Sequence, residues 1–293
     1  MPIELRWIAN RSASAMHALG VIATDRSVTD DALAQQLAAP AATIAGICRE
    51  LAIGVEPLFD HLVPESAAIE APTQLIDVVL RKAVGSTVAA DVAPRFVAAL
   101  IEAKATYATS RPNILDELEL RSGPLRELWE ARGPGLLHGI GRRTEPGLIV
   151  DRADVLLVEP VTGGGGTAHL AYNTVNFEAV LANPYADLPE IARLAWFLAQ
   201  LSGDLPRYSE QLDPGRCRQV SALAMLPPTL AAAADVELLH DSPAMLSRAI
   251  ERWQPGDATL AQTVTRWWQT YTANRPPWPV ALAALDQMVA ELA

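Results

Sequence analysis

Apolar residues recur at helical spacing over most of the chain. Within residues 29–53, leucine and isoleucine return in two groups, at Leu33 and Leu37 and then at Ile44 and Ile47. Prolines, glycines and short polar stretches separate segments of this kind on both sides of a central region. The spacing therefore predicts a chain built mainly of helices.

The pattern changes in the central region, where two stretches favour β-strands. Val155–Val158 is a short apolar run, and Ala168–Val180 alternates in polarity over thirteen residues. The glycines Gly163–Gly166 lie between them, as a hairpin loop would. We therefore expect an α+β protein, mainly α, multi-helical with one central β-hairpin or small antiparallel sheet.

The segment Val63–Pro72 is a candidate linker, because it holds two prolines, two glutamates and three alanines. It predicts an N-terminal helical subdomain, residues 1–66, and an α+β core, residues 67–293, with the hairpin at 154–180. A single domain, residues 1–293, is the alternative, because 293 residues that are half apolar can bury one large core.

The charge of the chain bears on its partners. With 23 basic and 34 acidic residues the formal net charge is −11, which repels polyanions at long range and disfavours nucleic acid. Lys82 and Lys104 are the only lysines, an arginine bias that we attribute to a GC-rich, bacterial genome. Composition thus favours a small molecule or a protein as partner.

The cysteines and the N-terminus bear on location. Cys48 and Cys217 lie far apart without a CxxC partner, which favours a reducing compartment. The N-terminus lacks the apolar run of a signal peptide, and no stretch approaches the ~18 consecutive apolar residues of a membrane span. We expect a cytoplasmic protein that is not inserted in a membrane.

The glycine loop is also a candidate phosphate cradle. Nucleotide-binding loops of that kind open a helix, whose N-terminal amides hold the anion. Here a strand follows Gly163–Gly166, and Gly-Lys-Ser/Thr is absent from the sequence. A flexible hairpin connection is the favoured interpretation.

Alternation assigns the residues of the second strand to two faces. We expect one face to be buried, with His169, Ala171, Asn173, Val175, Phe177 and Ala179. The opposite face would meet solvent or a ligand, with Leu170, Tyr172, Thr174, Asn176 and Glu178.

The candidate ligand-binding residues come from this strand and from one glycine-rich turn. His169 is either a hydrogen-bonded structural histidine or a group that faces a cleft, and His138 lies in the turn Gly135–Gly141. No cluster of His, Asp, Glu or Cys has metal-ligand spacing, so we expect no metal and no cofactor. The candidates are His138, His169, Tyr172, Asn176 and Glu178.

Residues Asp154–Leu201, read as a strand pair, a long edge-like strand and an apolar helix, resemble the core of zincin-type metalloproteases. In that family the helix carries HExxH, because histidines at i and i+4 share one face and bind one zinc, while the Glu acts on the metal-bound water. Here the best register places Trp196, Phe197 and Gln200 at those three positions. The resemblance implies a zincin-like protein that has lost metal hydrolysis.

A second resemblance covers residues 29–53, which are similar to the helix-turn-helix of bacterial regulators. Two apolar faces flank a short turn near Pro40. A recognition helix needs donors that reach bases and phosphates, whereas the second segment offers Arg49 as its only basic residue. We favour a helix-turn-helix shape used for packing.

These observations favour a non-catalytic binding or interaction protein, and a zincin-like pseudoenzyme is one form that it could take. Its expected functional surface is the cleft between the hairpin and the helix Pro189–Leu201. Two alternatives stay open: a hydrolase with a diverged or unlinked active site, and a DNA-binding regulator that acts through residues 29–53. A long strand with an exposed edge would also allow a homodimer.

Overall fold

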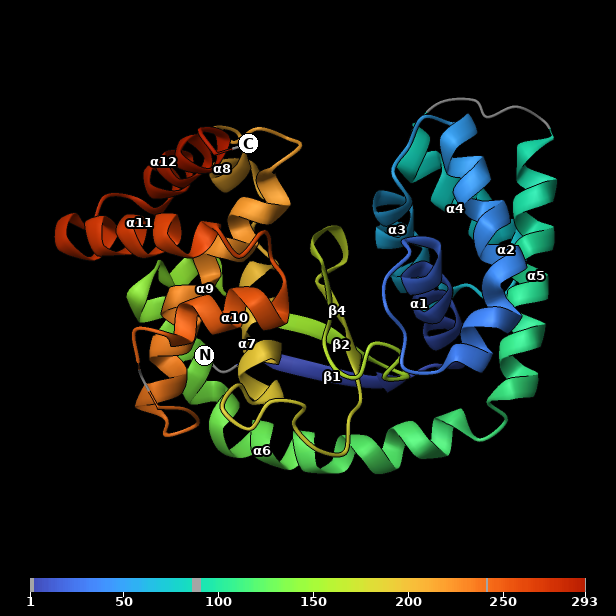
Figure 1. Ribbon diagram of the computed structural model, residues 1–293, viewed down its shortest axis with the longest axis horizontal. Helices are drawn as coiled ribbons and strands as arrows, with labels where there is room; N and C mark the ends of the chain where they lie inside the picture. Colours follow the sequence, from blue (N-terminus) through green and yellow to red (C-terminus); the bar gives the residue numbers. More distant parts are fainter. Residues whose placement is uncertain (1–2, 86–90, 241, 293) are drawn as a thin grey trace.

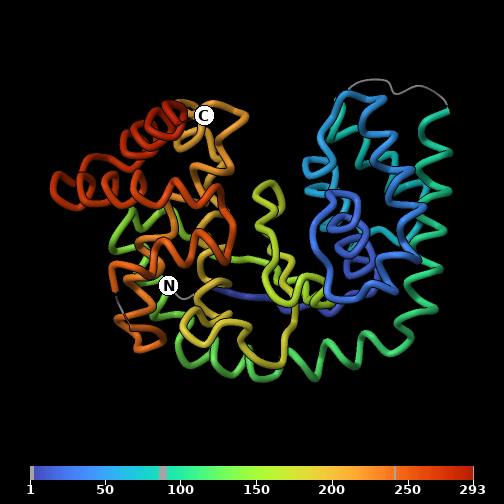
Figure 2. Tube along the Cα trace, viewed as in Figure 1, coloured from blue at the N-terminus to red at the C-terminus, as the bar shows by residue number. Residues whose placement is uncertain are grey.

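The computed structural model describes residues 3–85, 91–240 and 242–292. Within these ranges the chain forms twelve α-helices, two short 3₁₀ turns and four β-strands. The strands lie at the centre with a group of helices on either side, and the long helix α6 (Ile114–Arg143) runs along both groups (Figures 1 and 2). The fold is thus α+β and mainly α, as the helical spacing predicts.

The first group of helices is called the N-terminal lobe. Helix α1 packs against α2, α3 and α5, and α2 and α5 lie side by side. Each helix buries a stripe of residues at helical spacing, such as Leu58 and Leu62 of α3. The lobe comprises α1 (Arg11–Ala23), α2 (Asp31–Glu50), α3 (Val55–Ala68), α4 (Pro72–Val84) and α5 (Val92–Ser110).

The second group is called the C-terminal lobe, and helix α7 is its innermost element. All eleven residues of α7 are buried, because it packs against the sheet, α6 and α9. Edge-to-face contacts of the Trp278 ring with Trp267 and Tyr271, which stack on each other, join α11 to α12. The lobe comprises α7 (Glu190–Gln200), α8 (Pro206–Ser209), α9 (Cys217–Asp235), α10 (Met245–Trp253), α11 (Leu260–Asn274) and α12 (Trp278–Ala290).

The sheet has four strands in the order β1-β2-β4-β3. The strands β1, β2 and β4 are parallel, and β3 pairs antiparallel with β4 at the edge. β1 was not predicted, although Leu5 and Trp7 alternate with polar residues at Glu4 and Arg6. The strands are β1 (Glu4–Ala9), β2 (Arg152–Val158), β3 (Gly166–His169) and β4 (Thr174–Glu178).

The hairpin prediction is wrong in its detail. The stretch expected to form one long strand is broken by a 3₁₀ turn, Leu170–Tyr172, and by Asn173, whose φ is +46°. The hairpin consists of β3 and β4, and the sheet is mixed rather than antiparallel. Asparagine tolerates the left-handed conformation better than most residues, which allows the reversal at this position.

The glycine loop is therefore not a hairpin connection. It leads from β2 to β3, and β4 lies between those two strands. Gly164 and Gly165 have φ values of +129° and +126°, and an added Cβ would come within 2.7 Å of Pro184 and of Arg193 respectively. The close approach of this loop to its neighbours explains why glycine is needed at both positions.

The helix-turn-helix interpretation of residues 29–53 is also wrong. Asp31–Glu50 is one continuous helix with Pro40 inside it. Proline removes one backbone hydrogen bond, but Leu37 and Ile44 on either side are fully buried against α1 and α5. This packing outweighs the local preference for a break.

The expected division at residue 66 falls inside α3, which packs against both α1 and α4. Helix α3 continues as far as Ala68 and thus includes the first six residues of the expected linker, which begins at Val63. In the described ranges no single helix is long and apolar enough to cross a membrane, and α2 and α3 meet that test only together, as a pair bent by 119°.

Candidate functional site

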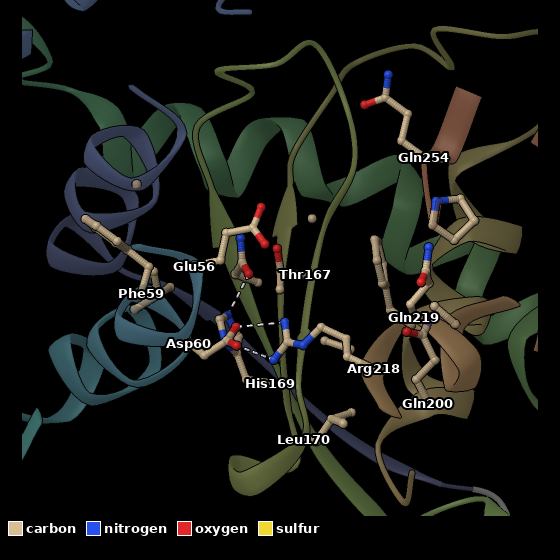
Figure 3. A pocket seen from close by; sticks show the side chains of 18 of the residues that line it. Glu56, Phe59, Asp60, Thr167, His169, Leu170, Gln200, Arg218, Gln219 and Gln254 are labelled. Carbon is tan, nitrogen blue, oxygen red and sulfur yellow. Dashed lines mark hydrogen bonds and ion pairs between the residues drawn. The ribbon is translucent and has the colours of Figure 1, made fainter. Parts of the chain in front are cut away.

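A cavity of about 560 Å³ lies between the two lobes. The N-terminal lobe contributes Glu56, Phe59 and Asp60 from α3, and the edge strand β3 contributes Thr167 and His169. The opposite wall comes from α7, α9 and the end of α10. Figure 3 shows side chains from all three sources turned toward one space, among them Gln200, Arg218, Gln219 and Gln254.

A buried carboxylate, that of Glu178, lies behind this cavity. It accepts hydrogen bonds from Nε2 of His17 at 2.8 Å, from the amides of Thr162 and Gly164 at 2.8 and 2.7 Å, and from the Thr162 hydroxyl at 3.0 Å. Burial alone raises the pKa of Glu178, but these hydrogen bonds outweigh it and hold the pKa below its ordinary value. Glu178 is therefore a buried anion.

Asn176 connects this carboxylate to the cavity. A carboxylate can only accept, so His17 donates from Nε2 and its Nδ1 is left to accept from the Asn176 amide nitrogen at 3.0 Å. The Asn176 oxygen then accepts from Nε2 of His169 at 2.7 Å. The network thus assigns the tautomer protonated at Nε2 to both His17 and His169. These hydrogen bonds form a row, His169–Asn176–His17–Glu178, in which each donor points toward Glu178.

The last atom of this row is Nδ1 of His169. His169 is 3% exposed and lines the cavity, and within residues 3–85, 91–240 and 242–292 its Nδ1 has no hydrogen-bond partner. Oδ1 of Asp60 lies 3.6 Å away. The wall of the cavity therefore includes a buried, unshared imidazole nitrogen beside a carboxylate oxygen.

Asp60 also joins the two lobes. Nη1 of Arg218, on α9, donates to Oδ1 of Asp60 at 2.8 Å, and Nη2 contacts the other carboxylate oxygen. Figure 3 shows the pair reaching across from opposite walls, with His169 beside it. This ion pair links α3 to α9 at the cavity.

The wall formed by the C-terminal lobe is aromatic and amidic. Trp196 stacks on Trp253 with the ring centroids 5.4 Å apart, and Phe197 lies against Trp196 at 4.7 Å. Gln200, one turn further along α7, lines the same cavity. The three positions that correspond to HExxH in the zincin resemblance therefore all face this space.

The backbone of β3 presents an open edge to the cavity. The amide of Glu178 donates to the Gly165 carbonyl at 2.9 Å, so Gly165 faces β4. Because an antiparallel ladder alternates, Thr167 also faces β4, whereas the backbone groups of Gly166 and Ala168 point the other way. In the part of the chain that the structure describes, β3 pairs with no strand on that side.

The glycine loop has a different role from a phosphate cradle. The backbone amides of Gly164 and of the preceding Thr162 donate hydrogen bonds to Glu178, so they are not free to bind a phosphate. Glu190 and Arg193 of α7 form a buried ion pair against the loop, with Nη2 3.2 Å from Oε1. Burial, opposed by Arg193 and reinforced by the charge of Glu178, raises the pKa of Glu190 to about 7.

Three of the five residues predicted for the site lie together, namely His169, Asn176 and Glu178. Tyr172 instead contacts His61 Nδ1 at 2.9 Å, in a separate group. His138 is on the exposed face of α6 and does not line the cavity.

The face assignment for the second strand is wrong, because Asn176 and Glu178 are 1% and 0% exposed. β4 lies inside the sheet and packs against α3 and α7, so both of its faces are covered. The sequence analysis missed His17, Asp60 and Arg218, which come from three separate helices.

Neither a metal-binding cluster in the described part of the chain nor a similar known protein accounts for this region. Among the described residues, no group of three or more His, Cys, Asp or Glu side chains is placed to hold a metal ion. The chain matches no family model, no curated protein and no solved structure.

Proposed function

We propose that this protein is a non-catalytic binding protein whose cavity holds an extended segment of polypeptide. The observation that carries the proposal is the open edge of β3, which lines the cavity with the backbone groups of Gly166 and Ala168. An unpaired strand edge binds an extended chain through main-chain hydrogen bonds, with no requirement for a particular sequence.

The opposite wall suits the same ligand. A peptide paired with β3 has a second backbone edge that needs partners, and Gln200, Gln219 and Gln254 supply amides on the far side. Side chains of a strand alternate between its faces, so every second peptide side chain would meet the rings of Trp196 and Trp253. The cavity volume lies within the ~300–1,000 Å³ of ligand pockets.

We propose binding and not catalysis because of the side chains that α7 contributes to the cavity. Where the zincin resemblance would need two metal ligands and an acid–base group, α7 presents Trp196, Phe197 and Gln200. Two aromatic rings and an amide provide contact surface and one hydrogen-bonding group. A zincin-like pseudoenzyme is accordingly part of this proposal. The antiparallel edge strand β3 and the buried helix α7, which both line the cavity, support it.

The proposal can be tested with short blocked peptides. The probe is acetyl-Ser-Val-Lys-Val-Ser-amide, and binding is followed by calorimetry and by tryptophan fluorescence, to which Trp196 and Trp253 in the cavity wall contribute. Methylation of one backbone nitrogen at a time removes single main-chain donors. Because alternate residues of a strand face β3, we expect methylation at the parity that faces β3 to weaken binding at least ~10-fold. Methylation at the other parity, whose donors face only the glutamine side chains, should weaken binding by no more than ~3-fold.

Two results would contradict the proposal. Equal effects at both parities would exclude pairing with β3, and the absence of binding to any peptide in the series would exclude a polypeptide ligand. Cleavage of the bound peptide, followed by mass spectrometry, would assign the hydrolase function instead.

A further inference from the structure

We infer that the cavity contains a subsite for a primary ammonium group, which lies beside Nδ1 of His169 and Oδ1 of Asp60 and donates to both. The inference rests on the proposed function and names the chemistry that the site selects in its peptide. The shared chemistry is –NH₃⁺, from a lysine side chain or from a chain N-terminus.

The direction of the hydrogen bonds makes the electrostatic potential negative at the His169 end of the row. His169, Asn176 and His17 each donate toward Glu178, so their dipoles are aligned along the row. Aligned hydrogen bonds polarise one another in a low-dielectric interior. The lone pair on the buried Nδ1 of His169, beside Oδ1 of Asp60, therefore has its acceptor strength increased.

Two acceptors then lie side by side. Nδ1 of His169 and Oδ1 of Asp60 are 3.6 Å apart, and in the assigned tautomer neither atom carries a proton. A group with several N–H bonds can donate to both, and Oδ1 has a second lone pair beyond the one that Arg218 occupies. An ammonium group meets this requirement and also gains a charge-assisted bond to the carboxylate.

The net charge of the cavity lining does not favour a cationic ligand over an anionic one. The cavity lining includes Arg26 and Arg218 as well as Glu56 and Asp60, so these four charges cancel. Their positions differ, however, because Glu56 and Asp60 are four residues apart and share one face of α3. The wall beside His169 is therefore acidic, and Arg218 approaches it from the opposite lobe.

The test compares the lysine peptide with a peptide in which norleucine replaces lysine, so that only the ammonium group is lost. We expect the lysine peptide to bind wild-type protein at least ~10-fold more tightly than the norleucine peptide does, because a hydrogen bond to a charged group contributes about that much affinity. A third peptide, with central norleucine and a free N-terminal amine, shows whether a chain terminus can fill the same subsite.

Variants separate a ligand-binding role of Asp60 from a structural one. Asp60→Asn should abolish the preference for lysine, because the new amide can itself donate to Nδ1 of His169. Arg218→Gln removes the link between the lobes but leaves the carboxylate in place, and should keep the preference. Asp77→Asn, on the exposed surface of α4 and outside the cavity lining, is the control and should change the preference less than ~3-fold.

The outcomes distinguish the inference from the proposed function. Equal binding of the lysine and norleucine peptides would overturn the ammonium subsite and leave the peptide-binding function intact. Loss of the preference in Arg218→Gln as well as in Asp60→Asn would assign Asp60 a structural role and overturn it too. Failure of every peptide to bind would overturn both proposals.

A measurement on the free protein gives an independent test. Nitrogen-15 NMR reports which ring nitrogen of each histidine carries its proton. We expect neutral His169 to be protonated at Nε2, as the bond to Asn176 requires. Protonation at Nδ1 in the neutral ring would remove the proposed acceptor and contradict the inference.

Discussion

Asp60 on α3 and Arg218 on α9 are 158 positions apart in the sequence and form an ion pair that joins the two lobes at the cavity. The Arg218 side chain is 46% exposed. Exposed ion pairs contribute little to stability, so this pair bears on access to the cavity more than on folding.

We expect Arg218→Gln to lower the free energy of unfolding by less than ~1 kcal/mol, because water screens the pair. Peptide association should become faster, because the lobes separate more readily without the link. Urea unfolding and stopped-flow fluorescence measure the two quantities. A loss of several kcal/mol would show that the pair is a main support of the fold.

Glu178 should be far more sensitive to substitution. Glu178→Gln replaces a buried anion that accepts from His17, Thr162 and Gly164 with a group that has only one accepting atom. Breaking a buried charged network of this kind costs about 3–5 kcal/mol. Thermal or urea unfolding measures the loss, and Glu210→Gln on the exposed surface is the control, expected to change stability by less than ~0.5 kcal/mol.

Glu190 predicts a specific dependence on pH. Its pKa rises from an ordinary 4.5 to about 7 in the folded protein, chiefly through burial. Between these values the unfolded chain loses its proton first, so the contribution of Glu190 to stability falls as the pH rises from about 4.5 to 7.

Glu190→Gln removes this dependence. Relative to wild type, the variant should therefore gain up to ~3 kcal/mol of stability between pH 4.5 and pH 8. Urea unfolding of both proteins at several pH values gives the difference. A difference that does not change with pH would show that Glu190 is not protonated in the folded state.

The glycine loop offers a matched pair of substitutions. Gly165→Ala places a Cβ 2.7 Å from Nη1 of Arg193 at a φ of +126°, so we expect a loss of at least ~1–3 kcal/mol. Gly123→Ala, inside α6 with nothing within 4 Å of its Cβ, should instead gain ~0.5–1 kcal/mol. Similar effects of the two substitutions would contradict the packing role of the loop.

Helical spacing and the central change of pattern were sufficient to predict the fold class. They failed where tertiary packing overrides a local signal, as at Pro40 inside α2. They also failed at residues 170–173, because alternation of polarity continues through a turn that reverses the chain. Asn173 was the available signal, since asparagine is among the few residues that adopt a left-handed conformation.

Half of the site could not be predicted for a different reason. His169, Asn176 and Glu178 lie close together in sequence, but Asn176 is joined to Glu178 through His17 from a distant helix. A single histidine in α1 and a single aspartate in α3 give no local pattern. Only the packing of α1 and α3 against the sheet brings His17 and Asp60 to this region.

We propose above that an extended peptide pairs with the open edge of β3. Residue-resolved amide hydrogen exchange tests it most directly, in the presence and absence of the blocked lysine peptide. We expect bound peptide to slow exchange at Ala168, whose amide faces the cavity, with little change at Thr167, which already faces β4. Saturating peptide that leaves exchange at Ala168 unchanged would contradict the account.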